Sequence, residues 1–164
     1  MRAWLFGRTL IGERVWDVSR LIDWATGRDD IDADAIVVTG NSGGGTVTLF
    51  SAAVDERIKV AVPGSYFNTF LDSIATIHHC ECNYIPGIMR YGEMYDVAGL
   101  IAPRAFMAVH GAEDDIYPIA ATQKAFAHLQ QVYKVFGAEQ RCALSIGNGG
   151  HRYYKADVWP FVAA

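Results

Sequence analysis

Four short apolar runs recur along the chain, and they constrain its fold more than any other feature. They are AIVVTG at 35–40, IKVAVPGS at 58–65, AFMAVHG at 105–111 and RCALSIG at 141–147. A short continuous apolar run such as AIVVTG is expected of a strand that is buried on both faces of its sheet. We predict a buried strand for the second run as well, and strands for the third and fourth.

Helical patterns separate these runs. Apolar residues at helical spacing predict an amphipathic helix over 11–26, and a second amphipathic pattern covers 119–136, where Gly137 ends it. GGTVTLFSAAV predicts a buried helix over about 43–54, a short helical piece lies near 93–100, and a last helix is expected from about Tyr153 to Phe161. Strands that alternate with helices favour βαβ units and a parallel sheet.

The expected fold is therefore α/β, with three layers around a short, mostly parallel sheet of about four strands. No internal repeat, low-complexity segment or linker divides the chain. We expect residues 1–164 to form a single catalytic domain. The stretch 66–101 has no regular pattern apart from its one helical piece, and it contains several aromatic residues.

Composition excludes several classes of partner. Hydrophobic residues make up 51% of the 164 residues and charged residues 20%, which suits a globular chain with a real core. The net charge is -4 and the basic residues are scattered, so a nucleic-acid partner is not expected. No segment approaches the roughly 20 uncharged residues that span a bilayer, so we expect no membrane partner.

The cysteines and the N-terminal residues bear on location. Three cysteines, Cys80, Cys82 and Cys142, are too few for a disulfide framework. The opening MRAWLFGRTLIGER lacks the clean apolar run and the cleavage site of a signal peptide. These features predict a reducing, cytoplasmic location.

A glycine-rich turn follows the first apolar run. Residues 40–44 read G-N-S-G-G, which matches G-x-S-x-G between a strand and a helix, the context of a nucleophile elbow. Side chains before and after the serine are expected to clash with neighbouring elements, and glycine removes the clash and tolerates the strained backbone. Ser42 is the predicted nucleophile. The helix that follows begins at Gly43, whose N–H is the predicted oxyanion donor.

A glycine-rich turn that binds phosphate is the alternative interpretation of this stretch. It does not fit two known patterns, because no Gly-Lys-Ser/Thr follows the turn and G-x-G-x-x-G is absent.

A nucleophilic serine needs a base, and in this architecture the chain order is serine, acid, histidine. His151 follows the fourth apolar run in GNGGHRYY, where the glycines let the loop carry an imidazole back over the end of the sheet. It is the predicted base. His78 and His79 lie in the irregular middle region, His110 is expected to pack at the end of a strand, and His128 is expected on a helix surface.

The acid is expected after the third apolar run, in HGAEDDIYP. Asp114 is the first candidate, Asp115 the second and Glu113 the third. The carboxylates that do not bind the histidine are expected to be solvated, or to lie at the start of the helix that opens near Pro118.

The elbow, the acid loop and the histidine loop have the residue types, the chain order and the positions after strands that a serine hydrolase needs. On these motifs the chain resembles the C-terminal half of an α/β-hydrolase. GNSGGG at 40–45, HGAEDDIYP at 110–118 and GGH at 149–151 carry the resemblance, and DERIKVAVPGS looks like the strand after the nucleophile helix. The chain is most similar to the esterases near acetyl xylan esterases and dienelactone hydrolases, and to the catalytic domain of prolyl oligopeptidases. In such enzymes the acid stands four residues before the loop proline, which favours Asp114 over Asp115. The resemblance implies that no cofactor or metal is needed.

The chain departs from that family at its start. A full hydrolase of this kind has about eight strands with the elbow strand fifth, whereas one helix alone precedes it here. The strands before it, and the loop that gives the second oxyanion N–H, are expected to be absent, so residue 1 is interpreted as a start within a longer protein. We expect the partners to be a small ester substrate and either a second copy, paired along the exposed strand edge, or the missing N-terminal half.

The HHCECN stretch at 78–83 is interpreted as a packed loop, because structural zinc sites space their cysteines more widely and need a fourth ligand. The predicted function is that of a serine carboxylesterase, which hydrolyses short-chain acyl esters through an acyl-enzyme. Two alternatives stay open. One is a serine peptidase of the prolyl oligopeptidase type, and the other is a catalytically silent fragment that acts as a binding module.

Overall fold

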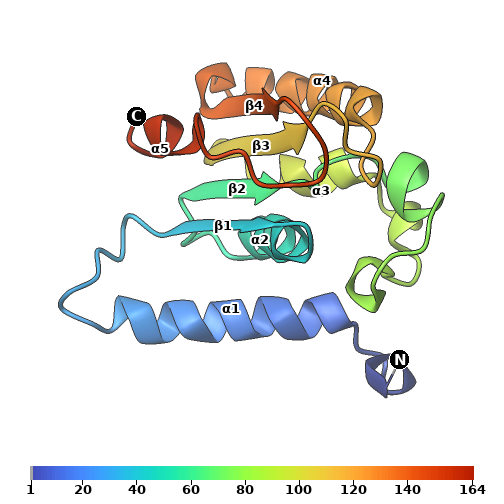
Figure 1. Ribbon diagram of the computed structural model, residues 1–164. Coiled ribbons are helices and arrows are strands. Elements are labelled where there is room, and N and C mark those ends of the chain that lie inside the picture. Colours follow the sequence, from blue (N-terminus) through green and yellow to red (C-terminus); the bar gives the residue numbers. More distant parts are fainter. Residues whose placement is uncertain (1) are drawn as a thin grey trace.

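A parallel sheet of four strands organises the computed structural model, which describes residues 2–164. The strands lie side by side in chain order, as Figure 1 shows. They are β1 (Val37–Asn41), β2 (Val60–Gly64), β3 (Ala105–Gly111) and β4 (Cys142–Gly147). Each parallel neighbour requires a crossover connection, and the helices supply these connections. The expected α/β fold class and the strand number are confirmed.

Five α-helices accompany the sheet in the described residues: α1 (Leu10–Thr26), α2 (Gly43–Val54), α3 (Met94–Gly99), α4 (Ile119–Val135) and α5 (Val158–Val162). Short 3₁₀ or π turns add η1 (Arg2–Phe6), η2 (Phe70–Ile74), η3 (Glu81–Asn83), η4 (Ile88–Arg90) and η5 (Glu139–Arg141). The first, second and fourth α-helices match the expected ranges closely, because their apolar periodicity or flanking glycines are local signals.

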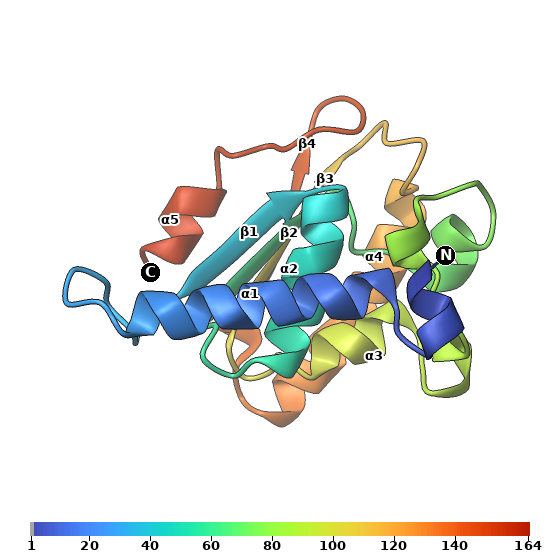
Figure 2. The same cartoon turned by 90° about the horizontal axis from the view of Figure 1, so that it is seen from below.

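The two faces of the sheet are covered unequally (Figure 2). The larger apolar core lies on the side of α2 and α4 and includes Leu49, Phe106 and Leu129, all fully buried. On the other face, Val62 and Val109 of the sheet pack with Val158 of α5. The C-terminal segment thus supplies the third layer.

The last helix differs from the prediction. It was expected from about Tyr153, but it begins at Val158, and residues 153–157 are irregular. The two tyrosines instead lie flat against glycines of the sheet. A methyl group built on Gly64 would meet the Tyr153 ring at 2.5 Å, and one built on Gly147 would overlap the Tyr154 ring. Packing on these glycines overrides the helical pattern.

The burial of β1 also differs from the prediction. A strand buried on both faces was expected, yet Val37 and Val38 are half-buried and Thr39 is exposed. β1 forms the edge of the sheet, with β2 as its neighbour on one side (Figure 1). Burial of an apolar strand depends on what lies beyond it, and no described strand lies beyond β1. The edge of the elbow strand is therefore open, as expected.

Three of the four tryptophans lie largely in solvent. Trp16 and Trp24 on α1 are each 59% exposed, and Trp159 on α5 is 60% exposed. Arg20 lies over the Trp16 ring at 4.4 Å and Arg28 over the Trp24 ring at 4.9 Å. In the part of the chain that the structure describes, no helix has the length and apolar character needed to cross a membrane.

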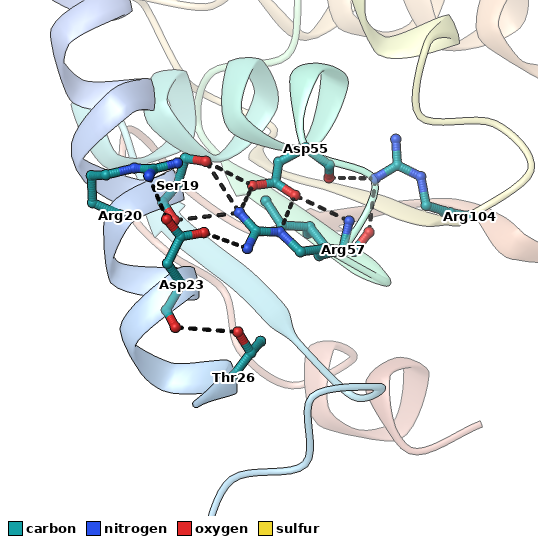
Figure 3. A network of polar contacts seen from close by, with 8 residues as sticks. Ser19, Arg20, Asp23, Thr26, Asp55, Arg57 and Arg104 are labelled. Carbon is teal, nitrogen blue, oxygen red and sulfur yellow. Dashed lines mark hydrogen bonds and ion pairs between the residues drawn. The ribbon is translucent and has the colours of Figure 1, made fainter. Parts of the chain in front are cut away.

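A polar network anchors the C-terminal end of α2 (Figure 3). Arg57 bonds the carboxylates of Asp55 and Asp23, each at 2.6 Å, and reaches the Ser19 side chain on α1. Arg104 donates to the main-chain carbonyls of Ala52, Asp55 and Ile58. Ala52 lies in the last turn of α2, where helix carbonyls lack partners within the helix. The Arg57 guanidinium lowers the pKa of Asp55 to about 2. These bonds fix α2, whose other end begins next to Ser42.

Candidate active site

The predicted elbow lies at the carboxyl end of β1. Ser42 joins β1 to α2 with φ 54° and ψ −115°, a conformation that a residue with a side chain rarely adopts. Its N–H donates to the Gly64 carbonyl at 2.8 Å, and its carbonyl accepts from the Thr46 N–H at 2.9 Å. A tight strand–turn–helix junction therefore presents the serine at the end of the sheet.

The glycines around the serine have different roles. A methyl group on Gly40 would lie 2.7 Å from the backbone of Gly44, and one on Gly45 would lie 2.6 Å from the Gly64 carbonyl oxygen. Methyl groups on Gly43 and Gly44 would meet nothing within 4 Å. The expectation of a clash on both sides of the serine holds for Gly40 and is wrong for the two glycines directly after it. On that side the close contact is made by Gly45.

An acid and a histidine lie close together in the loops that follow the carboxyl ends of β3 and β4. His151 Nδ1 lies 2.9 Å from Asp114 Oδ2, and the Asp114 side chain is fully buried. The second carboxylate oxygen of Asp114 accepts the N–H groups of Ile116 and Tyr117, each at 3.0 Å. These bonds hold the carboxylate rigidly, so it can hold one tautomer and one orientation of the imidazole.

The other two candidate acids point away. Glu113 and Asp115 are both exposed, and the carboxylate bonded to His151 is that of Asp114. Among the three carboxylates weighed from the sequence, the structure brings Asp114 alone to the histidine.

The loop that carries His151 is fixed against the end of β3. The Glu113 N–H donates to the Gly149 carbonyl at 2.8 Å, and the Tyr154 hydroxyl donates to the Gly150 carbonyl at 3.0 Å. A methyl group on Gly111 would overlap both of these loop carbonyls. The glycines therefore permit close backbone contact between the loops that follow β3 and β4.

The free nitrogen of His151 lies in a buried position. Its Nε2 atom is buried and makes no hydrogen bond within residues 2–164, so no bond to Ser42 is formed in this structure. The chain just after His151 is tied to the strands beside the elbow. Ser65 donates its hydroxyl to the Arg152 carbonyl at 3.2 Å, and the Tyr153 and Thr39 hydroxyls lie 2.5 Å apart.

The N-terminus of α2 provides a donor for an anion. Gly43 is exposed and its N–H makes no hydrogen bond in the described chain. A helix N-terminus with a free N–H favours negative charge. Before β1 the structure describes only η1 and α1, and no strand there supplies the loop that would hold a second donor.

One aromatic contact near the pair was not foreseen. The Tyr117 ring stacks on the His151 ring, with centroids 5.8 Å apart and planes 19° from parallel. Tyr117 in turn contacts Tyr66 edge-on at 5.5 Å and the His79 ring at 5.5 Å. Burial raises the pKa of Tyr117 well above its usual value. Tyr117 follows the acid by three residues, but nothing in the sequence separates it from any other buried tyrosine.

The remaining histidines take no part in this pair. His110 is fully buried at the end of β3, as expected for a packing residue, and burial lowers its pKa to about 4. His79 is also buried, and burial lowers its pKa. His128 is exposed, as expected, and stacks on Tyr95 with centroids 4.5 Å apart.

The HHCECN stretch forms a loop around η3. The thiols of Cys80 and Cys82 are free and lie 3.0 Å apart, and the Asn83 amide contacts Cys80 Sγ at 3.2 Å. Burial raises the pKa of Cys82 to about 11. Within residues 2–164, no group of three or more His, Cys, Asp or Glu side chains is arranged to hold a metal ion.

Comparison with known proteins fits this geometry. Residues 6–157 match the model of the prolyl oligopeptidase family, Peptidase_S9. The chain belongs to the prolyl oligopeptidase family. This confirms the resemblance drawn from the elbow, acid and histidine motifs. YtaP of Bacillus subtilis (strain 168), which carries the name of a hydrolase, is 27% identical over 150 residues, covering 90% of this chain and 50% of YtaP.

Solved structures share the fold of this prolyl oligopeptidase family chain. A carbohydrate esterase family 15 glucuronoyl esterase from Caldicellulosiruptor kristjansonii superposes with a TM-score of 0.78 at 20% identity, over 94% of this chain and 49% of that one. A glucuronoyl esterase from Solibacter usitatus gives 0.75 at 15% identity, over 95% and 48%. The methylesterase BT1017 gives 0.75 at 23% identity, over 93% and 34%. The chain thus spans about half the length of YtaP and of the two glucuronoyl esterases, and about a third of the methylesterase.

Proposed function

We propose that this chain carries the nucleophile, acid and base of a serine hydrolase that cleaves short-chain acyl esters. The observation that carries the proposal is the buried Asp114 carboxylate bonded to His151 Nδ1 at 2.9 Å, with His151 Nε2 left without a partner. An imidazole oriented in this way has one nitrogen held by the acid and the other available for a proton.

The chemistry would follow the serine esterase sequence. His151 Nε2 takes the proton of the Ser42 hydroxyl as Ser42 Oγ attacks the ester carbonyl. Asp114 stabilises the imidazolium, and the Gly43 N–H donates to the oxyanion of the tetrahedral intermediate. The intermediate collapses as His151 protonates the leaving alcohol, which gives an acyl-serine. Water, deprotonated by His151, then releases the acid and restores Ser42.

The similarity to solved structures that are named as esterases supports an ester as the substrate of this chain. A peptidase is the second candidate, and the observation in its favour is the prolyl oligopeptidase family match itself. The two activities share the same three residues and differ in the leaving group, an alcohol in one case and an amine in the other.

We also propose that the site is completed by a partner. Gly43 supplies one oxyanion donor, and the loss of one such donor reduces the rate by about 100- to 1,000-fold in other enzymes. The open edge of β1 lies next to the elbow and can pair with a further strand. A second copy, or a further part of the same protein, is the proposed partner.

Hydrolysis of p-nitrophenyl acetate, butyrate and decanoate tests the function, with Ser42→Ala as the control. We expect turnover of the short esters by the unmodified protein, none above background by Ser42→Ala, and no release of p-nitroaniline from a prolyl anilide. A fluorophosphonate should label Ser42 and not the alanine variant. Cleavage of the anilide would favour the peptidase. A folded protein that neither turns over nor reacts would show a silent binding module.

A further inference from the structure

An apolar cavity of about 330 Å³ lies among the irregular segments that follow β2. Its walls include Trp4 of η1, Phe70 and Ile74 of η2, Tyr84 directly after η3, and Met89 of η4. Neither Ser42, Asp114 nor His151 lines it. The walls are hydrophobic or aromatic with one exception, the amide of Asn83.

That amide connects the cavity to the elbow. The Thr46 hydroxyl donates to Asn83 Oδ1 at 3.4 Å and also lies 3.3 Å from the Ser42 carbonyl oxygen. Thr46 follows Ser42 by four residues in the first turn of α2, and residues so spaced on a helix lie about 5–6 Å apart. Asn83, the polar residue of the wall, therefore lies one hydrogen bond beyond a residue that is about one helical turn from the proposed nucleophile.

The same end of the sheet holds both features. Figure 1 shows the green segment that follows β2, together with η1, at the arrowheads of the strands. The carboxyl ends of parallel strands are where ligands bind in open α/β sheets. The elbow and the segments that form the cavity thus lie at the same end of the sheet (Figure 1).

The walls are held in place by hydrogen bonds. The Glu93 carboxylate accepts the N–H groups of Phe70 at 2.6 Å and Leu71 at 3.2 Å, which fixes the start of η2. The Tyr84 hydroxyl accepts the His79 N–H at 2.8 Å. A preformed concave site with apolar walls and a single polar group is the usual form of a small-molecule pocket.

We propose that this cavity binds an apolar group of the ester substrate, an aromatic ring or a branched alkyl group, joined to the ester carbonyl by about four atoms. The proposal rests on the proposed ester hydrolysis and narrows its substrate class. The volume is at the lower end of the range for small-molecule pockets, so it suits a compact group such as one ring. The group can belong to the acid or to the alcohol of the ester, and the kinetic arms below separate the two.

Direct binding tests the cavity without catalysis. The probe is 4-phenylbutan-1-ol, followed by saturation-transfer NMR and titration calorimetry on the whole chain. Ala75 is exposed, lines the cavity and has helical backbone angles, so Ala75→Phe fills the space without a buried substitution. Ala127→Phe on the exposed side of α4 is the matched control. We expect millimolar binding by the unmodified protein and the control, and at least tenfold weaker binding by Ala75→Phe.

Kinetics then assigns the side of the ester. The first arm compares p-nitrophenyl 4-phenylbutanoate with p-nitrophenyl acetate, and the second compares 4-phenylbutyl acetate with ethyl acetate. In one of the two comparisons, we expect kcat/KM to be about 10- to 100-fold higher for the phenyl substrate than for its reference ester. Ala75→Phe should lower this ratio of kcat/KM values at least tenfold.

The experiments distinguish a failure of the proposed ester hydrolysis from a failure of the cavity proposal. Binding of the alcohol without hydrolysis of any ester would overturn the proposed function and leave the cavity as a ligand site. Hydrolysis of acetate with no binding of the alcohol, or with equal binding by Ala75→Phe, would overturn the cavity proposal. Circular dichroism and thermal melting confirm that each variant is folded.

Discussion

Gly40→Ala is expected to distort the elbow, and the structure gives the size of the effect. The added methyl carbon would lie 2.7 Å from the carbonyl carbon and oxygen of Gly44 and 2.8 Å from its Cα. These are backbone atoms in the first turn of α2, so no flexible side chain can move aside. Such overpacking costs about 1–3 kcal/mol. We therefore expect the free energy of unfolding to fall by that amount.

Gly44→Ala is the matched control, because it changes the third glycine of the same motif. A methyl group there meets nothing within 4 Å, and the residue lies in α2. Alanine is favoured over glycine within a helix by about 0.5–1 kcal/mol. The two alanine variants should thus differ in stability by about 1.5–4 kcal/mol, although both break the same sequence pattern.

Urea denaturation followed by circular dichroism measures both changes, and the m-value should stay constant if only stability is altered. Esterase activity should follow the same order, since a shift of β1 or α2 displaces Ser42. The reasoning fails if Gly40→Ala unfolds at the same urea concentration as the unmodified protein. It also fails if Gly44→Ala loses as much stability as Gly40→Ala.

Three further predictions follow from the site and the core. Asp114→Asn should lower kcat by about 10⁴-fold through the wrong imidazole tautomer, whereas Asp115→Asn at an exposed position should stay within about twofold, as p-nitrophenyl acetate kinetics will show. His110 binds its proton less readily when folded, because burial lowers its pKa to about 4 from the ordinary histidine value of 6.5. The unfolded chain therefore takes up a proton first, and stability should fall by up to about 3 kcal/mol as the pH drops from about 6.5 to 4. Urea titrations across that range should show a weaker dependence of stability on pH for His110→Gln than for the unmodified protein. An equal dependence in the two proteins would contradict the role given to His110. Arg104→Met keeps the apolar stem but removes the donors to four main-chain carbonyls. It should lower the free energy of unfolding by about 2–4 kcal/mol, and an equal stability of the two proteins would show that water replaces these bonds.

The features that could be predicted from the sequence have local causes. The four strands and the long helices follow from apolar runs and helical periodicity, and the elbow at Ser42 follows from glycine spacing after a strand. The choice of Asp114 followed from chain order and from the resemblance to hydrolases in which the acid stands four residues before the loop proline. The structure places Asp114 against His151, while the catalytic roles of the two residues stay predictions.

The features that could not be predicted depend on contacts between distant segments. The half-exposure of β1 reflects the absence of a described neighbour on one side, which its own residues do not encode. Tyr153 lies in a stretch with a helical pattern, but its ring packs on Gly64 of β2, which is distant in the sequence. The cavity is formed by residues 70–89 and Trp4, where no periodic pattern exists to interpret.

The segment that covers the second face of the sheet also has a consequence for protein synthesis. That segment, from Tyr153 to Val158, begins two residues after His151, and the Tyr153 hydroxyl ties it to Thr39 of β1. His151 follows Ser42 by 151 − 42 = 109 residues. At roughly 5–20 residues per second, the ribosome adds the histidine about 5–20 s after the serine. A chain interrupted before His151 would lack the proposed base, so the proposed ester hydrolysis requires nearly the whole of this sequence.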